Sequence, residues 1–239
     1  MKPKFRLYFS ENLEKGKTFK LEKKQSHYVK NVIRLNQGDK ISLFNSKNGE
    51  WDTTIINHGK DFTEVIINKL SIPKKKENNL WLAFSPIKKV HQDFMLQKTT
   101  ELGVQKFLPI LCERSIARAI NIQRSQKIVV EASEQSNRIS IPQILQIQKL
   151  DSFLKNFPIN GNLIFCDINC SSNNLLKKIP KDAPTCVLVG PEGDFSEIER
   201  QSIVDHKKAL PISLGYNILR SETAAIAATT ILSFQLNFN

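Results

Sequence analysis

The residue types best suited to chemistry are concentrated in two loops near the end of the chain. The first loop, GPEGDF, spans residues 190–195 directly after the apolar run TCVLV, and the second, LGYNILRS, spans residues 214–221. Glycine permits positive φ and a close approach of a ligand to the backbone, so we expect both at Gly190 and Gly193. The loops therefore predict a site in which the main chain lies against a bound molecule.

The composition of the first loop indicates which kind of ligand it binds. GPEGDF matches neither G-x-G-x-x-G nor G-x-x-x-x-G-K-[ST], the glycine-rich patterns that bind phosphate. Glu192 and Asp194 would repel an anion. A cation, or a neutral heterocycle held by backbone groups, fits this loop better.

Both loops lead into an expected helix. Ser196 and Glu199 have the S-x-x-E spacing of a capping box. Ser221 is the expected N-cap of the alanine-rich helix that follows the second loop. We therefore expect each loop to be anchored where it ends.

Strand-like and helix-like segments alternate over residues 80–239. The expected strands are LWLAFS, KFLPIL, NLIFCD, TCVLVG and ALPISLG, and the expected helices lie near 90–102, 122–136, 172–179, 196–206 and 222–236. This alternation predicts an α/β domain with a mostly parallel sheet, in which ligands bind at the carboxyl ends of the strands. Both loops follow such strands.

The first 70 residues have a different pattern. Residues 40–70 contain period-two runs broken by turn signals, which predicts an all-β module. The preceding stretch SHYVKNVIRLNQGD predicts a short helix with His27, Lys30 and Arg34 on one face, which is either a solvated basic surface or an RNA contact. The basic, proline-containing segment 71–79 is the expected linker between domains at 1–70 and 80–239.

The overall charge favours a polyanionic partner. The 239 residues include 35 Lys and Arg against 23 Asp and Glu, a net charge of +12, although solubility alone could also explain this excess. The charged N-terminus and the lack of a long apolar run predict a cytoplasmic protein without a membrane partner. The four cysteines lack the spacing of zinc ligands, so we expect buried thiols and no metal site.

Taken together, five motifs resemble the RsmE family of the SPOUT superfamily, S-adenosylmethionine-dependent methyltransferases that act on N3 of a uridine in 16S ribosomal RNA. The resemblance covers nearly the whole chain and depends on QKTTELGV (97–104), ERS (113–115), EQSNR (134–138), GPEGDFSEIE (190–199) and LGYNILRSETAA (214–225). Asp194 and Asn137 stand where the family has glycine, and Asn217 stands where arginine is common. Asn tolerates left-handed backbone, whereas Asp194 is expected to alter its loop slightly and any role of residue 217 is in doubt.

The resemblance implies an N-terminal PUA-like β-barrel and a C-terminal α/β domain with a deep trefoil knot. It also implies a homodimer that methylates 16S ribosomal RNA within the small ribosomal subunit, with S-adenosylmethionine as methyl donor and no metal. The residues that would surround this donor are Leu188, Gly190, Pro191, Glu192, Gly193, Leu214, Gly215, Ile218 and Leu219.

Methylation of a weakly acidic N3 requires alignment, removal of a proton and stabilisation of the developing anion. Arg220 is the expected cation, because arginine keeps its charge. Glu101 is the expected catalytic carboxylate, although it could instead pair with a nearby lysine, and the sequence leaves the proton acceptor open. The expected RNA contacts are Arg6, His27, Lys30, Arg34, Gln97, Arg114, Gln135 and Arg138, of which Arg138 could instead cap a helix.

Two alternatives stay open at this point. A non-catalytic RNA-binding protein would use only the basic charge and the β module, and binding of S-adenosylmethionine would argue against it. A related knotted methyltransferase would share the cofactor and modify another RNA or a ribose 2′-oxygen.

Overall fold

The computed structural model describes residues 5–75, 77–170, 179–180 and 183–238. By its internal contacts the chain divides into two units, Met1–Lys76 with Ser133–Ile141, and Glu77–Ala132 with Pro142–Asn239. A segment from the middle of the chain thus belongs to the first unit. The domain boundaries at residues 70 and 80 stay a prediction, because a division by contacts does not test independent folding.

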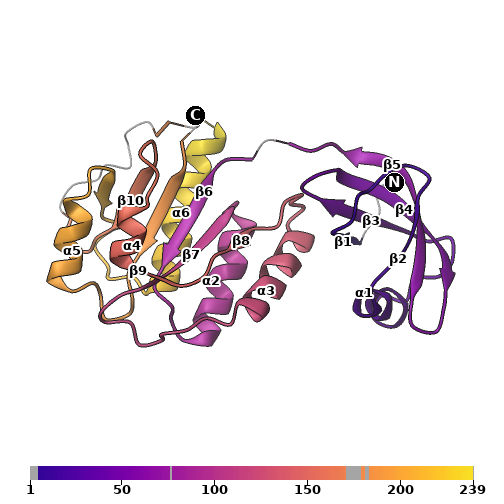
Figure 1. Cartoon of the computed structure of the whole chain (residues 1–239), viewed down its shortest axis with the longest axis horizontal. Coiled ribbons are helices and arrows are strands. Elements are labelled where there is room, and N and C mark those ends of the chain that lie inside the picture. The colour runs from indigo at the N-terminus through magenta and orange to yellow at the C-terminus, as the bar shows by residue number, and fades with distance from the viewer. Residues whose placement is uncertain (1–4, 76, 171–178, 181–182, 239) are drawn as a thin grey trace. The chain divides into compact units, whose positions relative to one another are not determined.

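The first unit is built on a five-stranded sheet with the order β1-β3-β4-β5-β2 (Figure 1). β1 runs parallel to β3, and the other pairs are antiparallel. Register shifts along the long β4–β5 pair mark bulges, which bend and twist a sheet. The strands are β1 (Arg6–Tyr8), β2 (Thr18–Lys20), β3 (Lys40–Asn45), β4 (Gly49–His58) and β5 (Thr63–Ile72).

The helix expected near residues 26–39 is shorter and irregular. A short helix α1 (Lys23–His27) continues directly as one π-helical segment η1 (Tyr28–Val32). Arg34 follows the end of η1 and has a left-handed backbone with φ of 55°. The prediction that Arg34 shares a helix face with His27 and Lys30 is therefore wrong.

The second unit contains a parallel sheet with the order β12-β10-β11-β6-β7-β8, and β9 pairs with β7. The five expected strands are present, and two short ones, β8 and β9, were not expected. This is the α/β arrangement of the SPOUT fold, whereas the knot stays a prediction. The strands are β6 (Leu80–Phe84), β7 (Lys106–Leu111), β8 (Gln143–Ile144), β9 (Gln148–Lys149), β10 (Asn162–Cys166), β11 (Thr185–Val189) and β12 (Ala209–Ile212).

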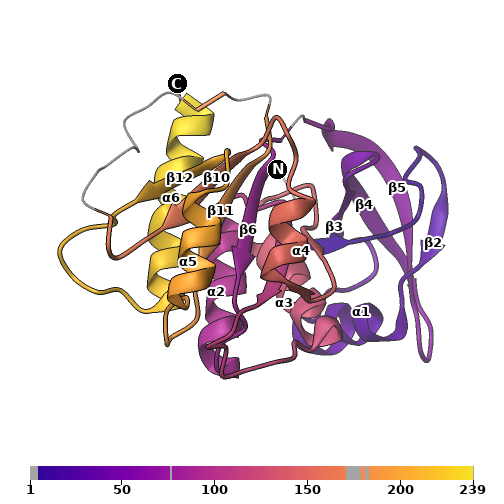
Figure 2. The same ribbon diagram turned by 60° about the vertical axis from the view of Figure 1, so that its left-hand side comes forward.

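Helices cover both faces of this sheet. In Figure 2, α4 and α5 lie in front of the strands, and α2 and α6 lie behind them. The helix expected near 172–179 falls on residues 171–178, outside the described ranges, and α4 was not expected. None of the helices in those ranges combines the length and apolar character that crossing a membrane requires. The helices are α2 (Lys89–Glu101), α3 (Ile122–Gln135), α4 (Leu150–Lys155), α5 (Glu197–Val204) and α6 (Ser221–Phe238).

Candidate active site

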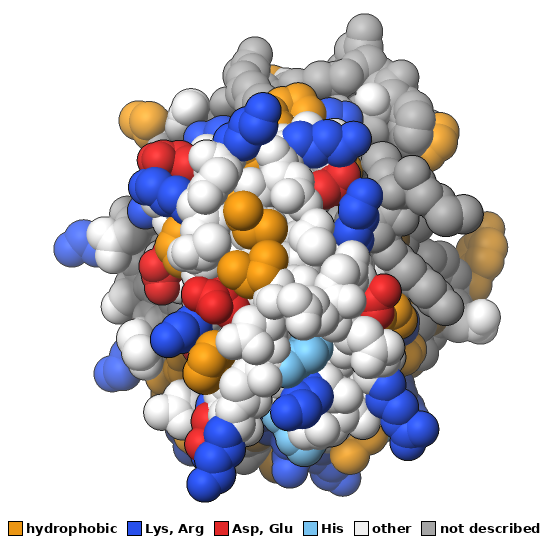
Figure 3. All heavy atoms as spheres, turned by 90° about the vertical axis from the view of Figure 1, so that its right-hand side faces the viewer, with side chains coloured by type: hydrophobic (Ala, Val, Ile, Leu, Met, Phe, Trp, Pro, Cys, Tyr) orange, Lys and Arg blue, Asp and Glu red, His pale blue; other side chains and the backbone are white. Residues whose placement is uncertain are grey.

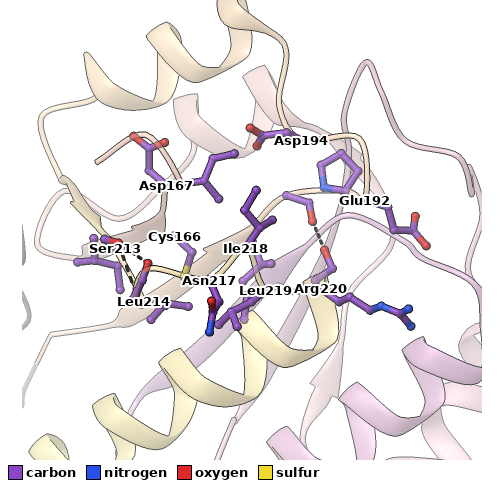
Figure 4. A pocket seen from close by; sticks show the side chains of 18 of the residues that line it. Cys166, Asp167, Glu192, Asp194, Ser213, Leu214, Asn217, Ile218, Leu219 and Arg220 are labelled. Atoms are coloured by element: carbon purple, nitrogen blue, oxygen red, sulfur yellow. Dashed lines mark hydrogen bonds between the residues drawn. The ribbon is translucent and has the colours of Figure 1, made fainter. Parts of the chain in front are cut away.

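A pocket of about 310 Å³ is lined by the carboxyl ends of β10, β11 and β12 and the loops that follow them (Figure 4). Its lining comes from residues 166–168, 189–192 with 194, and 212–221 with 224. The two glycine-containing loops, far apart in sequence, thus form one cavity, at the edge of the sheet where open α/β folds bind ligands.

The first loop is shaped by an aromatic ring. A Cβ atom at Gly190 would lie 2.7 Å from Cε2 of Phe195, a buried side chain whose ring packs edge-on against Phe165 at a centroid distance of 5.4 Å. Positive φ occurs at Asp194, with φ of 60°, and at neither Gly190 nor Gly193. The expectation of positive φ at these two glycines is therefore wrong, and Gly190 is needed to accommodate Phe195.

Residues from the ERS motif hold this loop from outside. The predicted capping box is confirmed: Ser196 Oγ accepts from the Glu199 N–H, and Glu199 Oε2 accepts from the Ser196 N–H at 3.1 Å. Glu199 Oε1 also accepts from the Glu113 N–H at 2.8 Å. Arg114 Nη1 donates to the carbonyl oxygens of Gly193 and Phe195 at 3.4 and 3.3 Å. The backbone of the first loop is therefore fixed without a ligand.

The second loop has fewer contacts of its own. Gly215 has φ of 136°, and a Cβ there would meet nothing within 4 Å. Tyr216 and Ile218 are exposed, with relative accessibilities of 109% and 83%. The loop ends at Ser221, whose Oγ donates to the carbonyl oxygen of Gly190. This hydrogen bond links the two loops directly.

The start of α6 differs from the expected cap. The helix begins at Ser221, and the carbonyl oxygen of Arg220 accepts from the Ala224 N–H at 2.8 Å. Arg220 therefore takes the cap position, and the hydroxyl of Ser221 is free to bind the first loop. Glu222, in the first turn, pairs with Nδ1 of His91 on α2 at 3.0 Å. These contacts hold the backbone next to Arg220.

The pocket is lined by three carboxylates and one basic side chain. Asp167 is buried and bonded to Arg200, with Nη2 2.7 Å from Oδ2, and this bond raises the pKa of the Arg200 guanidinium. Asp194 accepts from the Phe195 N–H at 2.8 Å. The side chains of Glu192 and Arg220 make no hydrogen bond or ion pair with any residue that the structure describes. The pocket thus has two carboxylates held by the protein and one that is free.

Burial raises the pKa of three of the four thiols. Cys166 lines the pocket, and burial raises its pKa to about 12. Burial likewise raises the pKa of Cys112 to about 12 and that of Cys186 above its ordinary range. A thiol that stays protonated is a poor nucleophile. Over the described part of the chain, no cluster of His, Cys, Asp and Glu could hold a metal ion.

The structure brings most of the predicted loop residues together. Leu188 is buried in β11 and Gly193 lies beside the pocket, and neither lines it. Glu101 also lies outside the lining and pairs with Lys98 Nζ at 2.9 Å. Their roles in binding or catalysis stay predictions. The predicted residues that line the pocket are Gly190, Pro191, Glu192, Leu214, Gly215, Ile218, Leu219 and Arg220.

Comparison with known proteins assigns the chain to a family. An RNA methyltransferase domain matches residues 74–233, and an RNA methyltransferase PUA domain matches residues 21–68. Ribosomal RNA small subunit methyltransferase E of Rickettsia conorii is 32% identical over 228 residues, which cover 93% of this chain and 92% of that one. This chain belongs to that methyltransferase E family. The expected resemblance is thereby confirmed.

Solved structures agree with this assignment. The methyltransferase E of Neisseria gonorrhoeae bound to S-adenosyl methionine is 31% identical, with a TM-score of 0.88 over 97% of this chain and 96% of that one. A Legionella pneumophila protein in complex with the same cofactor is 28% identical, with a TM-score of 0.86 over 95% and 96% of the two chains. The two-part SPOUT and PUA-like fold of the methyltransferase E family is therefore shown.

Two arginines predicted to contact RNA have internal partners. Arg6 pairs with Glu50 at 2.9 Å and donates to the carbonyl oxygens of Ser133, Glu134 and Arg138 at 3.1, 2.9 and 2.7 Å, all within the first unit. Arg138 is 9% exposed, and its Nη2 lies 3.1 Å from Ser140 Oγ. Both guanidinium groups stabilise the protein, and contact with RNA stays a prediction.

Other predicted RNA contacts lie on the surface. His27 and Lys30 line a pocket of about 70 Å³ together with Lys23, Lys60 and Asp61, and Lys23 pairs with Asp61 at 3.1 Å. On the face shown in Figure 3, Lys and Arg side chains are spread over the surface with Asp and Glu among them. The other exposed residues of this set are Arg34, Gln97 and Gln135. Arg114 is exposed as well, and its guanidinium donates to the first loop. The structure thus gathers two of the eight predicted contacts, His27 and Lys30, in one pocket.

Two functional features were missed. Asp167 lines the pocket and directly follows β10. The rule that open α/β sheets bind ligands at the carboxyl ends of their strands could therefore have identified it. The Ser221–Gly190 hydrogen bond joins residues 31 positions apart, and no spacing pattern in this methyltransferase E chain indicates such a bond.

Proposed function

We propose that this chain transfers a methyl group from S-adenosylmethionine to N3 of a uridine in the 16S RNA of the small ribosomal subunit. The observation that carries the proposal is the pocket that both signature loops of this family build together. Relatives named ribosomal RNA small subunit methyltransferase E, and the cofactor-bound Neisseria gonorrhoeae structure, support it.

The residues of the pocket fit this cofactor. Its volume of about 310 Å³ lies within the range of small-molecule sites. Apolar side chains such as Val189, Ile212 and Leu219 and the two loop backbones suit a neutral heterocycle, and the carboxylates suit a cation. Bound S-adenosylmethionine supplies an electrophilic methyl group.

Arg220 has the charge and the freedom to stabilise the acceptor base. Its side chain is exposed and has no partner among the described residues, and Figure 4 shows it extending out of the pocket. As N3 loses its proton, negative charge spreads onto the neighbouring carbonyl oxygens of uracil. A guanidinium positioned at these oxygens stabilises that charge.

RNA binding is proposed to use the surface pocket of His27 and Lys30. If the lysines of this pocket contact phosphates, affinity for RNA falls steeply as salt rises, and Lys30→Ala reduces the slope of log K against log salt by about one. Fluorescence anisotropy with a ribosomal RNA fragment over a salt series measures this slope. An unchanged slope in Lys30→Ala would remove this residue from the interface.

A homodimer acting in the cytoplasm on the small ribosomal subunit completes the proposal. Exposed apolar side chains occur on α2 at Val90 and Phe94, in the second loop at Ile218, and on α6 at Phe234. Apolar surface of this kind is typical of a protein contact. Light scattering coupled to size exclusion measures the mass of the particle, and a strict monomer would contradict the dimer.

Two measurements test the function itself. Calorimetry should show S-adenosylmethionine binding to the protein, and mass spectrometry of ribosomal RNA from cells lacking the gene should show one unmethylated uridine. Cofactor binding without a missing base methylation would instead favour another RNA or a ribose oxygen. No cofactor binding, with or without RNA, would favour a non-catalytic RNA-binding protein.

A further inference from the structure

We propose that Glu192 is the proton acceptor for the methylated base, an inference that rests on the proposed function. Transfer to N3 requires removal of the N3 proton, and a carboxylate in the pocket is the simplest group to accept it. Glu101, the carboxylate expected from the sequence, lies outside the pocket lining and pairs with Lys98. The proton acceptor must then be sought among the carboxylates that line the pocket.

Two of the three lining carboxylates are already engaged. Asp167 is 5% exposed and accepts from Nε and Nη2 of Arg200 at 3.2 and 2.7 Å, so each of its oxygens is bonded to a cation. Asp194 accepts from its neighbouring N–H at 2.8 Å, which holds its side chain against its own loop. Both carboxylates are therefore oriented by hydrogen bonds within the protein.

Glu192 is the carboxylate that remains available. It is exposed, it lines the pocket, and it has no hydrogen-bond or ion-pair partner in the described ranges. Figure 4 shows its side chain and that of Arg220 extending toward the same side of the pocket, away from Asp167. A base entering from that side would meet a proton acceptor and a cation together.

The positions of the two side chains match the two needs of the reaction. The Glu192 carboxylate accepts the N3 proton, and the electron pair left on N3 forms the new bond to the methyl carbon. The bond from that carbon to sulfur breaks, its electron pair stays on the now neutral sulfur, and the carboxylic acid returns its proton to water. Arg220 faces the carbonyl oxygens on which charge develops in this step.

Its surroundings favour Glu192 for this role over a purely structural one. Pro191 on one side and the Arg114 bond to the Gly193 carbonyl on the other hold the backbone at residue 192, whereas the side chain itself is unrestrained by described residues. A fixed backbone with a free carboxylate is the arrangement expected of a group that waits for a substrate.

The test compares Glu192→Gln with Glu197→Gln, an exposed glutamate in the first turn of α5 outside the pocket. Single-turnover methylation of small ribosomal subunits from cells lacking the gene is followed from pH 6 to pH 9, and calorimetry measures S-adenosylmethionine binding to each variant. At pH 7, Glu192→Gln should be slower by about 100-fold or more, because a general base contributes ~10²–10⁴. The measured cofactor affinities set the S-adenosylmethionine concentration that saturates each variant, so the rates compare methyl transfer alone.

The pH profile separates the proton acceptor from a structural residue. Without a protein base, the uracil must lose its proton to the solution, so the rate of Glu192→Gln should rise by about tenfold for each pH unit until it approaches the native rate. Glu197→Gln should follow the native profile. A Glu192→Gln defect of constant size at every pH, or a normal rate, would overturn the inference. An inactive native protein would overturn the proposed function instead.

Discussion

The two loops of the pocket are built in opposite ways. The first loop is held by the Phe195 ring, by a capping box and by Arg114 and Glu113 of a neighbouring segment. The second loop exposes Tyr216 and Ile218 and is attached chiefly where it ends, through Ser221. The first loop is therefore held in place by contacts within the protein, whereas the conformation of the second loop depends on contacts with a ligand.

This difference shows how a loop rich in small residues can serve two purposes. In the first loop, Gly190 makes room for the protein itself, and in the second, Gly215 allows a backbone turn that faces open space. We infer that the bound cofactor supplies contacts that the second loop lacks. Variants in each loop should therefore fail in different assays.

The largest effect is expected at the end of the second loop. Arg220→Ala should lower the methylation rate by about 100-fold or more, ~2.7 kcal/mol, because loss of one donor to a developing anion costs that much. Thermal stability should be unchanged, since the Arg220 side chain is exposed and without a described partner. Single-turnover methylation together with a melting curve measures both quantities.

Arg220→Lys is the matched control for this variant. It keeps the positive charge and loses the planar pair of donors, so an intermediate rate is expected. A near-native rate in Arg220→Ala would remove the guanidinium from the mechanism and would leave the second loop with a binding role alone.

A smaller effect, on stability, is expected in the first loop. Gly190→Ala would place a Cβ 2.7 Å from the ring of Phe195 and should destabilise the second unit by ~1–3 kcal/mol, as overpacking of a core does. Urea unfolding measures the difference in free energy. Gly193→Ala is the control, because its Cβ would lie 3.5 Å from Cβ of Arg114, an ordinary contact. If Gly190→Ala and Gly193→Ala have the same free energy of unfolding, the Phe195 ring can move to accommodate the added Cβ at little cost.

The same contrast explains what could be predicted from the sequence. Patterns within about ten residues were sufficient for the five longer strands of the α/β domain, for most helices and for the Ser196–Glu199 capping box, because these depend on local periodicity and spacing. The family motifs located the pocket. Contacts between distant segments were not accessible: the burial of Arg6 and Arg138 and the hydrogen bond from Ser221 to Gly190 all depend on tertiary packing.

The smallest expected effect lies in the bond that joins the two loops. Ser221 is 8% exposed and donates to the half-buried Gly190 carbonyl oxygen, so Ser221→Ala leaves that acceptor without its donor and should cost ~1 kcal/mol. Because the second loop has few other attachments, the loss should appear mainly as weaker S-adenosylmethionine binding, by about fivefold, with little change in the melting temperature. Ser202→Ala, on the exposed face of α5, removes a hydroxyl whose bond to Ile198 stays within one helix and serves as the control. A Ser221→Ala protein that melts at a lower temperature and binds the cofactor normally would show that packing holds the two loops together. The first loop would then order the second loop without this hydrogen bond.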